Sequence, residues 1–394
     1  MRQAQKKVMV LGAGTIGVVV ACLLSEHEDY EDYEDYEDYE DYEDYEDYED
    51  YEIILADRDD KALDVWSKGQ ANFHTVHLNV TDSDALRLCL SEHALHGVIS
   101  ALPFYCNCAV ARIANELQIA YFDLSEDVAI AQYIHSLSTK QPTPFVPQCG
   151  LAPGFISIVA NDLMGEFEVL ETVKLRVGAL PINPNNALKY SLTWSTEGLI
   201  NEYCNPCYGL EEGQVVTLLP FEGYETIELD GLLYEAFNTS GGLGTLAETY
   251  KGRVKTMNYK TLRYPGHCEK MQFMMNDLKL KEDRRMLKRI LENAIPKTLR
   301  DVVLIYVSVT GKQQGELFEK NYANKIYPRI IVNKSCSAIQ VTTAASVCAI
   351  TDLVLQHSAR YQGFIPQECF NLNEVLENRF GQFFGVQHRP PGLL

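Results

Sequence analysis

Three glycines near the amino end of the chain have the spacing of a phosphate-binding turn. Gly12, Gly14 and Gly17 match the pattern G-x-G-x-x-G and follow a short apolar segment, residues 8–11. In such a turn the first glycine allows the bend, the second lets the backbone approach a pyrophosphate, and the third lets a helix pack on its strand. A helix beginning at Thr15 would point the positive end of its dipole at the phosphates. The glycine pattern alone is weak evidence for nucleotide binding, so the strand before it, the helix after it and the acidic residue beyond them must support it.

An acidic repeat separates this turn from the carboxylate that should accompany it. Residues 28–51 are eight copies of Glu-Asp-Tyr, and Asp57 ends the apolar segment that follows them. Gly17 and Asp57 are 40 residues apart, and removing seven copies, or 21 residues, leaves 19. A carboxylate about 20 residues after the glycines accepts the ribose hydroxyls of a dinucleotide. We therefore expect a dinucleotide-binding domain that prefers NAD to NADP, although Arg58 could accommodate a 2′-phosphate.

Seven of the eight copies look like an expansion of the loop between the first helix and the second strand. That loop lies away from the crevice where ligands bind, and lengthening it costs little closure entropy. We expect the repeat to be disordered and without a role, with an acidic docking tail as the alternative. The formal charge of −21 also comes from the repeat, because without seven copies 41 acidic residues face 34 basic ones, a net −7. This ordinary balance disfavours a nucleic-acid partner.

Length and composition indicate a globular enzyme of two domains without a membrane partner. The chain has 394 residues, of which 46% are hydrophobic, and no apolar run of about 18 residues. Arg2, Lys6 and Lys7 before residues 19–22 resemble an export signal, but a signal needs neither the glycine pattern nor Asp57. Eleven irregularly spaced cysteines favour a reducing cytoplasm over a disulfide framework.

Metal binding is not expected. Cys204 and Cys207 form a C-x-x-C motif, which Cys106 with Cys108, or His267 with its neighbour, could complete. A lone motif of this kind without a matching second pair is weak evidence for zinc.

Strands and helices alternate up to about residue 150, which predicts a doubly wound parallel Rossmann sheet of the α/β class over residues 1–150. The predicted strands after the first two are 73–80, 97–101, 120–124 and one that follows 144–147, and the predicted helices are 60–68, one that ends near 92, 107–117 and 125–137. The carboxyl ends of such strands line the cofactor crevice. Besides the glycines and Asp57, the cofactor candidates are Thr15, Ile16, Arg58, Asn79, Ser100, Ala101 and Leu102.

The second half is β-rich and irregular, which predicts an α+β substrate, catalytic and oligomerisation domain over residues 151–340. Its predicted strands are 172–177, 187–194, 214–219 and 254–264, with a helix over 279–294 and a hairpin of 302–309 with 317–322. Residues 342–355 indicate a buried helix, so that 341–394 would return to the first domain. The chemistry of such an arrangement lies in the cleft between the domains.

Three segments of this half combine side chains that could bind a substrate. Residues 193–198 end a predicted strand and cap a helix, and residues 237–242 form a glycine-containing loop rich in hydrogen-bond donors. Residues 261–267 bring an arginine, a tyrosine and a histidine together at a strand end.

With these segments the chain resembles the saccharopine dehydrogenase-like family, and most closely its lysine 6-dehydrogenase branch. The shared segments, in order along the chain, are 12–17, 150–154, 195–199, 239–242 and 261–267. The resemblance runs from about Lys7 to the C-terminal tail, and only the acidic repeat is foreign to it. The saccharopine reductase branch typically has Gly-Leu-Asp-Pro-Gly where residues 150–154 are Gly-Leu-Ala-Pro-Gly. This departure weakens the saccharopine interpretation without excluding it.

The resemblance implies NAD-linked oxidative deamination of the ε-amine of L-lysine, giving ammonia and a semialdehyde that closes to a cyclic imine. The amine must be neutral to react, although free lysine has a pKa of about 10.4. A base or a desolvated pocket must remove the proton, and a polarised water must hydrolyse the imine. Asp123, which ends a strand near the nicotinamide, and His267 are the candidate bases, with Tyr105 as a further proton donor. Alternatively, Asp123 caps the helix starting near Ser125, and His267 is a satisfied interior residue.

Lysine also carries an α-carboxylate, which needs a guanidinium, and an α-ammonium, which needs a carboxylate. Arg263 is the candidate for the carboxylate and Glu197 for the ammonium, while Thr239 and Ser240 could add hydroxyl contacts. Alternatively, Arg263 pairs with a structural acid and Glu197 is a first-turn helix acid.

Two rival functions accompany this hypothesis. Saccharopine dehydrogenase would need a second basic group for the glutamate arm of its substrate. A non-catalytic nucleotide-binding protein would be favoured if Asp123 and His267 both point away from the nicotinamide. In either enzyme a homodimer or higher homo-oligomer is expected.

Overall fold

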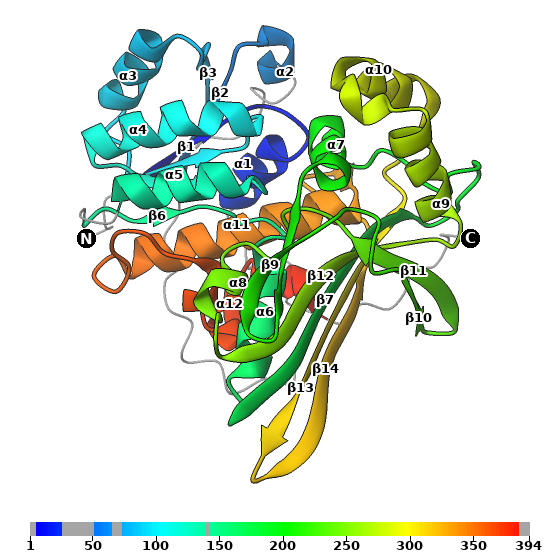
Figure 1. Ribbon diagram of the computed structural model, residues 1–394. Coiled ribbons are helices and arrows are strands. Elements are labelled where there is room, and N and C mark those ends of the chain that lie inside the picture. Colours follow the sequence, from blue (N-terminus) through cyan, green and yellow to red (C-terminus); the bar gives the residue numbers. More distant parts are fainter. Residues whose placement is uncertain (1–4, 26–50, 65–72, 139–141, 386–394) are drawn as a thin grey trace, which may run out of the picture.

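The computed structural model describes residues 5–25, 51–64, 73–138 and 142–385. These residues form two sheets with helices packed around them (Figure 1). The Glu-Asp-Tyr repeat lies outside the described residues apart from its last tyrosine, Tyr51, and so does the end of the tail after residue 385.

The first sheet is a six-stranded parallel sheet in the order β3-β2-β1-β4-β5-β6. Its strands are β1 (Lys6–Leu11), β2 (Tyr51–Asp57), β3 (Phe73–His77), β4 (Gly97–Ser100), β5 (Ala120–Asp123) and β6 (Phe145–Val146). Its helices are α1 (Gly17–Ser25), α2 (Asp60–Asp64), α3 (Ser83–Glu92), α4 (Asn107–Leu117) and α5 (Val128–Ser138). This strand order is that of a dinucleotide-binding doubly wound fold. The predicted Rossmann sheet is therefore confirmed.

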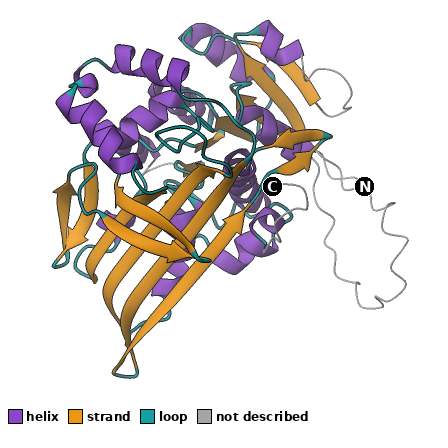
Figure 2. Ribbon diagram, turned by 90° about the vertical axis from the view of Figure 1, so that its right-hand side faces the viewer, coloured by secondary structure: helices purple, strands orange, loops and turns teal. Residues whose placement is uncertain are grey.

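The second sheet has eight strands, and six of them follow the order β10-β11-β12-β7-β13-β14. These are β7 (Val169–Pro181), β10 (Glu225–Leu229), β11 (Leu232–Asn238), β12 (Val254–Arg263), β13 (Asp301–Gln313) and β14 (Glu316–Ile326), and β8 (Cys207–Glu211) pairs with β9 (Gln214–Leu218) at one side. Figure 2 shows these strands side by side as one broad layer. The predicted hairpin is confirmed, and β13 and β14 extend it at both ends.

The helices of the second half are short except for one. They are α6 (Phe155–Met164), α7 (Thr196–Cys204), α8 (Leu246–Thr249), α9 (His267–Gln272), α10 (Arg284–Ala294), α11 (Ala338–Gln356) and α12 (Leu372–Glu377). The short hairpin β15 (Arg329–Ile331) and β16 (Lys334–Cys336) precedes α11.

One predicted strand, 187–194, is wrong. This segment makes a single bridge, between Leu192 and Lys297, and otherwise has no regular structure. Its alternating apolar residues Tyr190 and Leu192 instead pack into a core cluster with α7 and α10. Alternation reports which side chains are buried, and burial does not require a strand partner.

Helix α11 joins the two halves, as predicted for residues 342–355. Its start is fixed by Ser337, which makes a capping box, and by Asp301, whose carboxylate accepts from the first two backbone N–H groups of the helix. The helix packs against both α1 and β13, and the Gln340 amide donates to the carbonyl oxygen of Thr15 at 3.1 Å. By length and composition it could cross a membrane, but 78% of its apolar window is buried inside the protein.

Candidate active site

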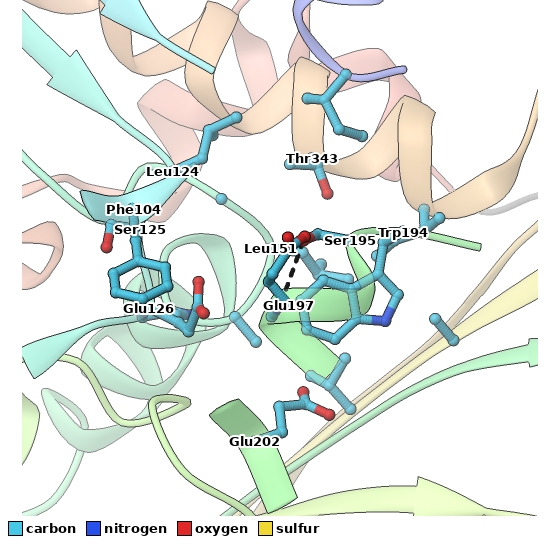
Figure 3. Close-up of a pocket in the computed structure, with 18 of the residues that line it drawn as sticks. Phe104, Leu124, Ser125, Glu126, Leu151, Trp194, Ser195, Glu197, Glu202 and Thr343 are labelled. Carbon is cyan, nitrogen blue, oxygen red and sulfur yellow. Dashed lines mark hydrogen bonds between the residues drawn. The ribbon is translucent and has the colours of Figure 1, made fainter. Parts of the chain in front are cut away.

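A pocket lies where the carboxyl edge of the parallel sheet faces α7, α11 and the second sheet (Figure 3). The parallel sheet contributes the loops at residues 101–104 and 124–126, and the turn at 150–153 closes one side. Strands β7 and β12 supply most of the opposite wall, and Thr343 reaches the pocket from α11. The pocket therefore occupies the position at which doubly wound folds bind their ligands.

The glycine turn beside this pocket fits a dinucleotide. A Cβ atom on Gly12, whose φ is +104°, would lie 2.9 Å from the Ala101 carbonyl oxygen, and one on Gly17 would lie 1.9 Å from the Gly12 carbonyl oxygen. Neither position admits a side chain. A Cβ atom on Gly14 would meet nothing within 4 Å, so the backbone there faces open space. That open backbone, ahead of α1, is the cradle that a pyrophosphate requires.

Asp57 is held next to the turn by two backbone N–H groups. Its Oδ2 accepts from Ala13 N at 2.7 Å and its Oδ1 from Asp59 N at 2.9 Å. Arg58 is exposed, and Asn79 is exposed with its amide oxygen accepting from Thr81. The geometry leaves the remaining lone pairs of Asp57 available for ribose hydroxyls.

Of the other cofactor candidates, three line the pocket and two do not. Ile16, Ala101 and Leu102 line the pocket. Ser100 is buried and donates from Oγ to Asn107 Oδ1 at 2.7 Å, so it secures α4 instead. The side chain of Thr15 is exposed at the turn.

Asp123 and Tyr105, two of the three catalytic candidates, do not line the pocket. Asp123 is buried, and its carboxylate accepts from Tyr121 Oη at 2.8 Å, Ser125 N at 2.9 Å and Gln148 N at 3.1 Å. Burial raises the pKa of Asp123 to about 6, against these hydrogen bonds, which lower it. The capping alternative is also wrong, because α5 starts at Val128 and Asp127 Oδ1 accepts from Ile130 N at 3.0 Å, whereas Asp123 holds the turn after β5. Tyr105 is 63% exposed outside the pocket.

His267, the third catalytic candidate, is an interior residue. It is 1% exposed, its Nδ1 lies 2.8 Å from the Leu188 carbonyl oxygen, and its Nε2 lies 2.9 Å from Tyr203 Oη. Burial, together with the charge of Arg263, lowers the pKa of His267 to about 3. A neutral imidazole with both nitrogens engaged and no access to the pocket matches the alternative of a satisfied interior residue.

Arg263 does reach the pocket, from the end of β12. Its Nη1 donates to the Leu262 carbonyl oxygen at 2.9 Å and to Thr261 Oγ1, while its Nε donates to Tyr203 Oη at 3.0 Å. Its Nη2 pairs with Glu202 Oε2 at 3.1 Å. The guanidinium thus has a structural acid as partner, and among the described residues one Nη2 hydrogen remains without an acceptor.

Two of the other three substrate candidates line the pocket and one does not. Glu197 lines the pocket in the first turn of α7 and makes an ion pair with Lys288 on α10. Ser240 also lines the pocket, and its Oγ donates to the Pro206 carbonyl oxygen at 2.8 Å. Thr239 is buried outside the pocket, and its hydroxyl has no partner among the described residues.

Two carboxylates in the pocket were missed by the sequence analysis, Glu126 and Glu202 (Figure 3). Glu126 follows β5, and its Oε1 accepts from Asn201 Nδ2 at 3.3 Å. Burial raises the pKa of Glu126, and it raises the pKa of Glu202 to about 7 although Arg263 lowers it. The signal for Glu126 was its place three residues after a strand end. For Glu202 the only signal was its place in α7, one helical turn after Gly198 on the same face.

The charged side chains that line the pocket are Glu126, Glu197, Glu202 and Arg263. The described lining is therefore acidic, with three carboxylates and one guanidinium. Within the described part of the chain, no group of three or more histidine, cysteine and acidic side chains could hold a metal ion.

Family models match both halves of the chain. The saccharopine dehydrogenase C-terminal domain matches residues 150–382, and the saccharopine dehydrogenase NADP binding domain matches residues 39–144. Beside the dinucleotide-type sheet, the pocket offers a guanidinium and three carboxylates, groups that can bind the charged groups of an amino acid. With the two family models, these features define an amino-acid oxidoreductase. The chain belongs to the saccharopine dehydrogenase family, as its sequence resemblance predicts.

Two solved structures share the fold over most of their length. The saccharopine dehydrogenase (L-Glu forming) of Saccharomyces cerevisiae has a TM-score of 0.72 at 16% identity, covering 94% of this chain and 96% of that one. The homospermidine synthase of Legionella pneumophila, solved in complex with NAD, has a TM-score of 0.63 at 13% identity, covering 98% and 90%. One family description names NADP, whereas the homospermidine synthase structure holds NAD. The comparisons therefore leave the choice of nicotinamide cofactor open.

A curated relative matches part of the chain. The α-aminoadipic semialdehyde synthase of Arabidopsis thaliana is 24% identical over 213 residues. This alignment covers 50% of the chain and 20% of the relative, so the chain spans a small part of that protein's length.

Proposed function

We propose that this protein is an NAD-dependent dehydrogenase that oxidises the ε-amine of L-lysine. The observation that carries the proposal is the charge of the pocket lining, three carboxylates against one guanidinium. Lysine brings two ammonium groups and one carboxylate, so its charges complement such a lining. A substrate with more carboxylates than amines would meet net repulsion there.

The amino-acid head of the substrate is assigned to the inner wall. Arg263 receives the α-carboxylate, and Glu202 beside it receives the α-ammonium, so that the existing ion pair is replaced by two pairs with the substrate. Glu202 must be ionised for this role. Its pKa of about 7, raised by burial, makes that condition dependent on pH in the neutral range.

The reacting end of the substrate is assigned to the edge of the parallel sheet. A nicotinamide cofactor held by the glycine turn and Asp57 would supply the hydride acceptor. Glu126, which follows β5 and has a pKa raised by burial, is positioned to take a proton from the ε-ammonium. The neutral amine then loses hydride from its carbon to give an iminium ion. Water adds to this ion, ammonia leaves, and the semialdehyde closes on its own α-amine.

Saccharopine oxidation is the second candidate, favoured by the family to which the chain belongs. Saccharopine carries an additional glutamate arm with two carboxylates, which calls for more basic groups. No lysine or second arginine lines the described pocket. Lys288, which pairs with the lining residue Glu197, is not itself part of the lining. This lining supports lysine as the substrate.

The deciding experiment is an assay of reduced cofactor formation with lysine, saccharopine, ornithine and diaminopimelate, each with NAD and with NADP. We expect the highest kcat/KM with lysine and NAD. A higher kcat/KM with saccharopine would establish the second candidate. A non-catalytic nucleotide-binding protein is the third candidate, favoured by the positions of Asp123 and His267, neither of which lines the pocket. Measurable NAD binding without oxidation of any of the four amines would establish it.

A further inference from the structure

A chain of hydrogen bonds runs from the pocket arginine into the interior of the protein. Arg263 Nε donates to Tyr203 Oη at 3.0 Å, Tyr203 Oη lies 2.9 Å from His267 Nε2, and His267 Nδ1 lies 2.8 Å from the Leu188 carbonyl oxygen. The three side chains are 3%, 2% and 1% exposed, respectively. Of the three, only Arg263 lines the pocket.

The direction of every bond in this chain is fixed by its inner end. The Leu188 carbonyl oxygen can only accept, so Nδ1 of His267 carries the proton. The pKa of His267 is lowered to about 3 by burial, so the ring is neutral and its Nε2 must accept. The Tyr203 hydroxyl therefore donates to His267, and its oxygen lone pairs are left for the Nε–H of Arg263.

The remaining contacts of the guanidinium determine which edge is presented to the pocket. Nη1 is engaged by Thr261 and by the Leu262 carbonyl oxygen, and the ring of Tyr190 lies 5.0 Å from the guanidinium carbon. With Nε and Nη1 committed to the interior, Nη2 is the nitrogen that meets Glu202. An arginine held in this way loses little conformational freedom when it binds an anion.

We propose that Tyr203 and His267 are positioning residues that hold Arg263 for the carboxylate group of the substrate. The proposal rests on the proposed function, in which Arg263 receives that carboxylate. Neither residue touches the substrate, and His267 acts only through Tyr203. Their effect is confined to ligands that carry a carboxylate. Amines without one bind independently of this chain of hydrogen bonds.

The test compares three ligands that differ in their charged groups. These are L-lysine, hexanoate and pentane-1,5-diamine, which is lysine without its carboxylate, and their dissociation constants are measured calorimetrically on the NADH complex. Tyr203→Phe leaves the Nε–H of Arg263 without an acceptor, so we expect lysine and hexanoate to bind about tenfold more weakly. The diamine should bind as it does to the wild type. Tyr234→Phe, at a second buried tyrosine, is the matched control and should change none of the three constants.

The role of His267 is tested by two substitutions, only one of which keeps a hydrogen-bond acceptor for the Tyr203 hydroxyl. His267→Gln can place its amide oxygen where Nε2 accepts from Tyr203, whereas His267→Phe offers no acceptor. We expect the glutamine variant to bind lysine more tightly than the phenylalanine variant, with equal diamine binding. In proteins labelled with 15N-arginine, the Nε–H signal of Arg263 should shift in Tyr203→Phe and stay in place in Tyr234→Phe.

Several outcomes would overturn the inference. They are an equal loss for all three ligands in Tyr203→Phe, no loss for any of them, or a wild type that binds neither lysine nor hexanoate. A wild type that binds both carboxylates, with the selective loss in Tyr203→Phe, but oxidises no amine would support the inference while refuting the proposed function.

Discussion

Arg263 and Glu202 form a buried ion pair inside the pocket, with Nη2 and Oε2 3.1 Å apart and side chains that are 3% and 13% exposed. A buried charge is destabilising unless an opposite charge compensates it, so removing one partner leaves the other as an uncompensated buried charge. In this pair each charge compensates the other, and a zwitterionic amino acid can replace both partners one for one.

Glu202→Gln should remove a pH dependence near neutrality. Because only the carboxylate can hold an ammonium group, kcat/KM for lysine in the wild type should rise as the pH passes through about 7, where burial places the pKa of Glu202. The variant should lack this limb and be about tenfold less active above pH 8, the loss of one charged hydrogen bond. The measurement is kcat/KM from pH 5 to 9, and a limb that persists in the variant would assign the titration to another group.

The same substitution makes a prediction about stability. Burial raises the pKa of Glu202 in the folded protein to about 7, above the ordinary value of 4.5, so ionisation of this carboxyl opposes folding. Relative to Glu202→Gln, the wild type should thus lose free energy of unfolding as the pH rises from about 4.5 to about 7. Urea unfolding at several pH values measures this difference, and a difference that grows with pH would contradict it.

Gly14→Ala and Gly17→Ala should separate cofactor binding from folding. A Cβ atom on Gly14 meets no protein atom within 4 Å but fills the space that a pyrophosphate needs, so NAD should bind at least about tenfold more weakly with little change in melting temperature. A Cβ atom on Gly17 would lie 1.9 Å from the Gly12 carbonyl oxygen, which should cost about 2 kcal/mol or more of stability. Calorimetry and thermal melts of both variants test the pair, and unchanged NAD affinity in Gly14→Ala would place the phosphates elsewhere.

Asp57→Asn should weaken the preference for NAD over NADP. The asparagine keeps an acceptor oxygen for only one of the two backbone N–H groups, that of Ala13 or that of Asp59, and it removes the negative charge that repels a 2′-phosphate. We expect the ratio of kcat/KM with NAD to that with NADP to fall about tenfold. A wild type that already prefers NADP would show that Arg58 outweighs Asp57.

The cofactor half of the fold could be predicted because its signals are local. One βαβ unit contains the glycine pattern, the strand before it and Asp57 after it. The distance in sequence from Gly17 to Asp57 is also the expected one once seven copies of the repeat are subtracted. Asp82 likewise caps α3 through hydrogen bonds to Asp84 and Ala85, two and three residues away. Such contacts depend on neighbours in the sequence, so the sequence carries them.

The site could be predicted only in part because its contacts join distant segments. Arg263 was found as a charged residue at a strand end, but its partner Tyr203 lies 60 residues earlier on another element. His267 has the side chain of a base, yet tertiary packing buries it and makes it neutral. Glu126 lines the pocket and accepts a hydrogen bond from Asn201, which is 75 residues away in the sequence. No local pattern therefore distinguished it from a surface acid.

Glu126→Gln should lower kcat far more than it raises KM. If Glu126 removes the proton from the ε-ammonium, its loss removes general-base catalysis, which contributes about 10²–10⁴-fold, while Arg263 and Glu202 still hold the amino-acid head. The amide is nearly the same size as the carboxylate and can still accept from Asn201 Nδ2, so the fold should be preserved. Glu197→Gln is the comparison, since Glu197 pairs with Lys288 at a position that is 42% exposed, and it should lower kcat much less.

The decisive measurement is a single-turnover experiment with lysine and NAD as a function of pH. If the proton is lost to Glu126, raising the pH should partly restore the Glu126→Gln variant, because free amine becomes available as the pH approaches the lysine pKa of about 10.4. The wild type should show a smaller increase over the same range. Equal kcat losses in Glu126→Gln and Glu197→Gln, or no recovery at high pH, would mean that Glu126 contributes charge to the pocket and takes no proton from the amine.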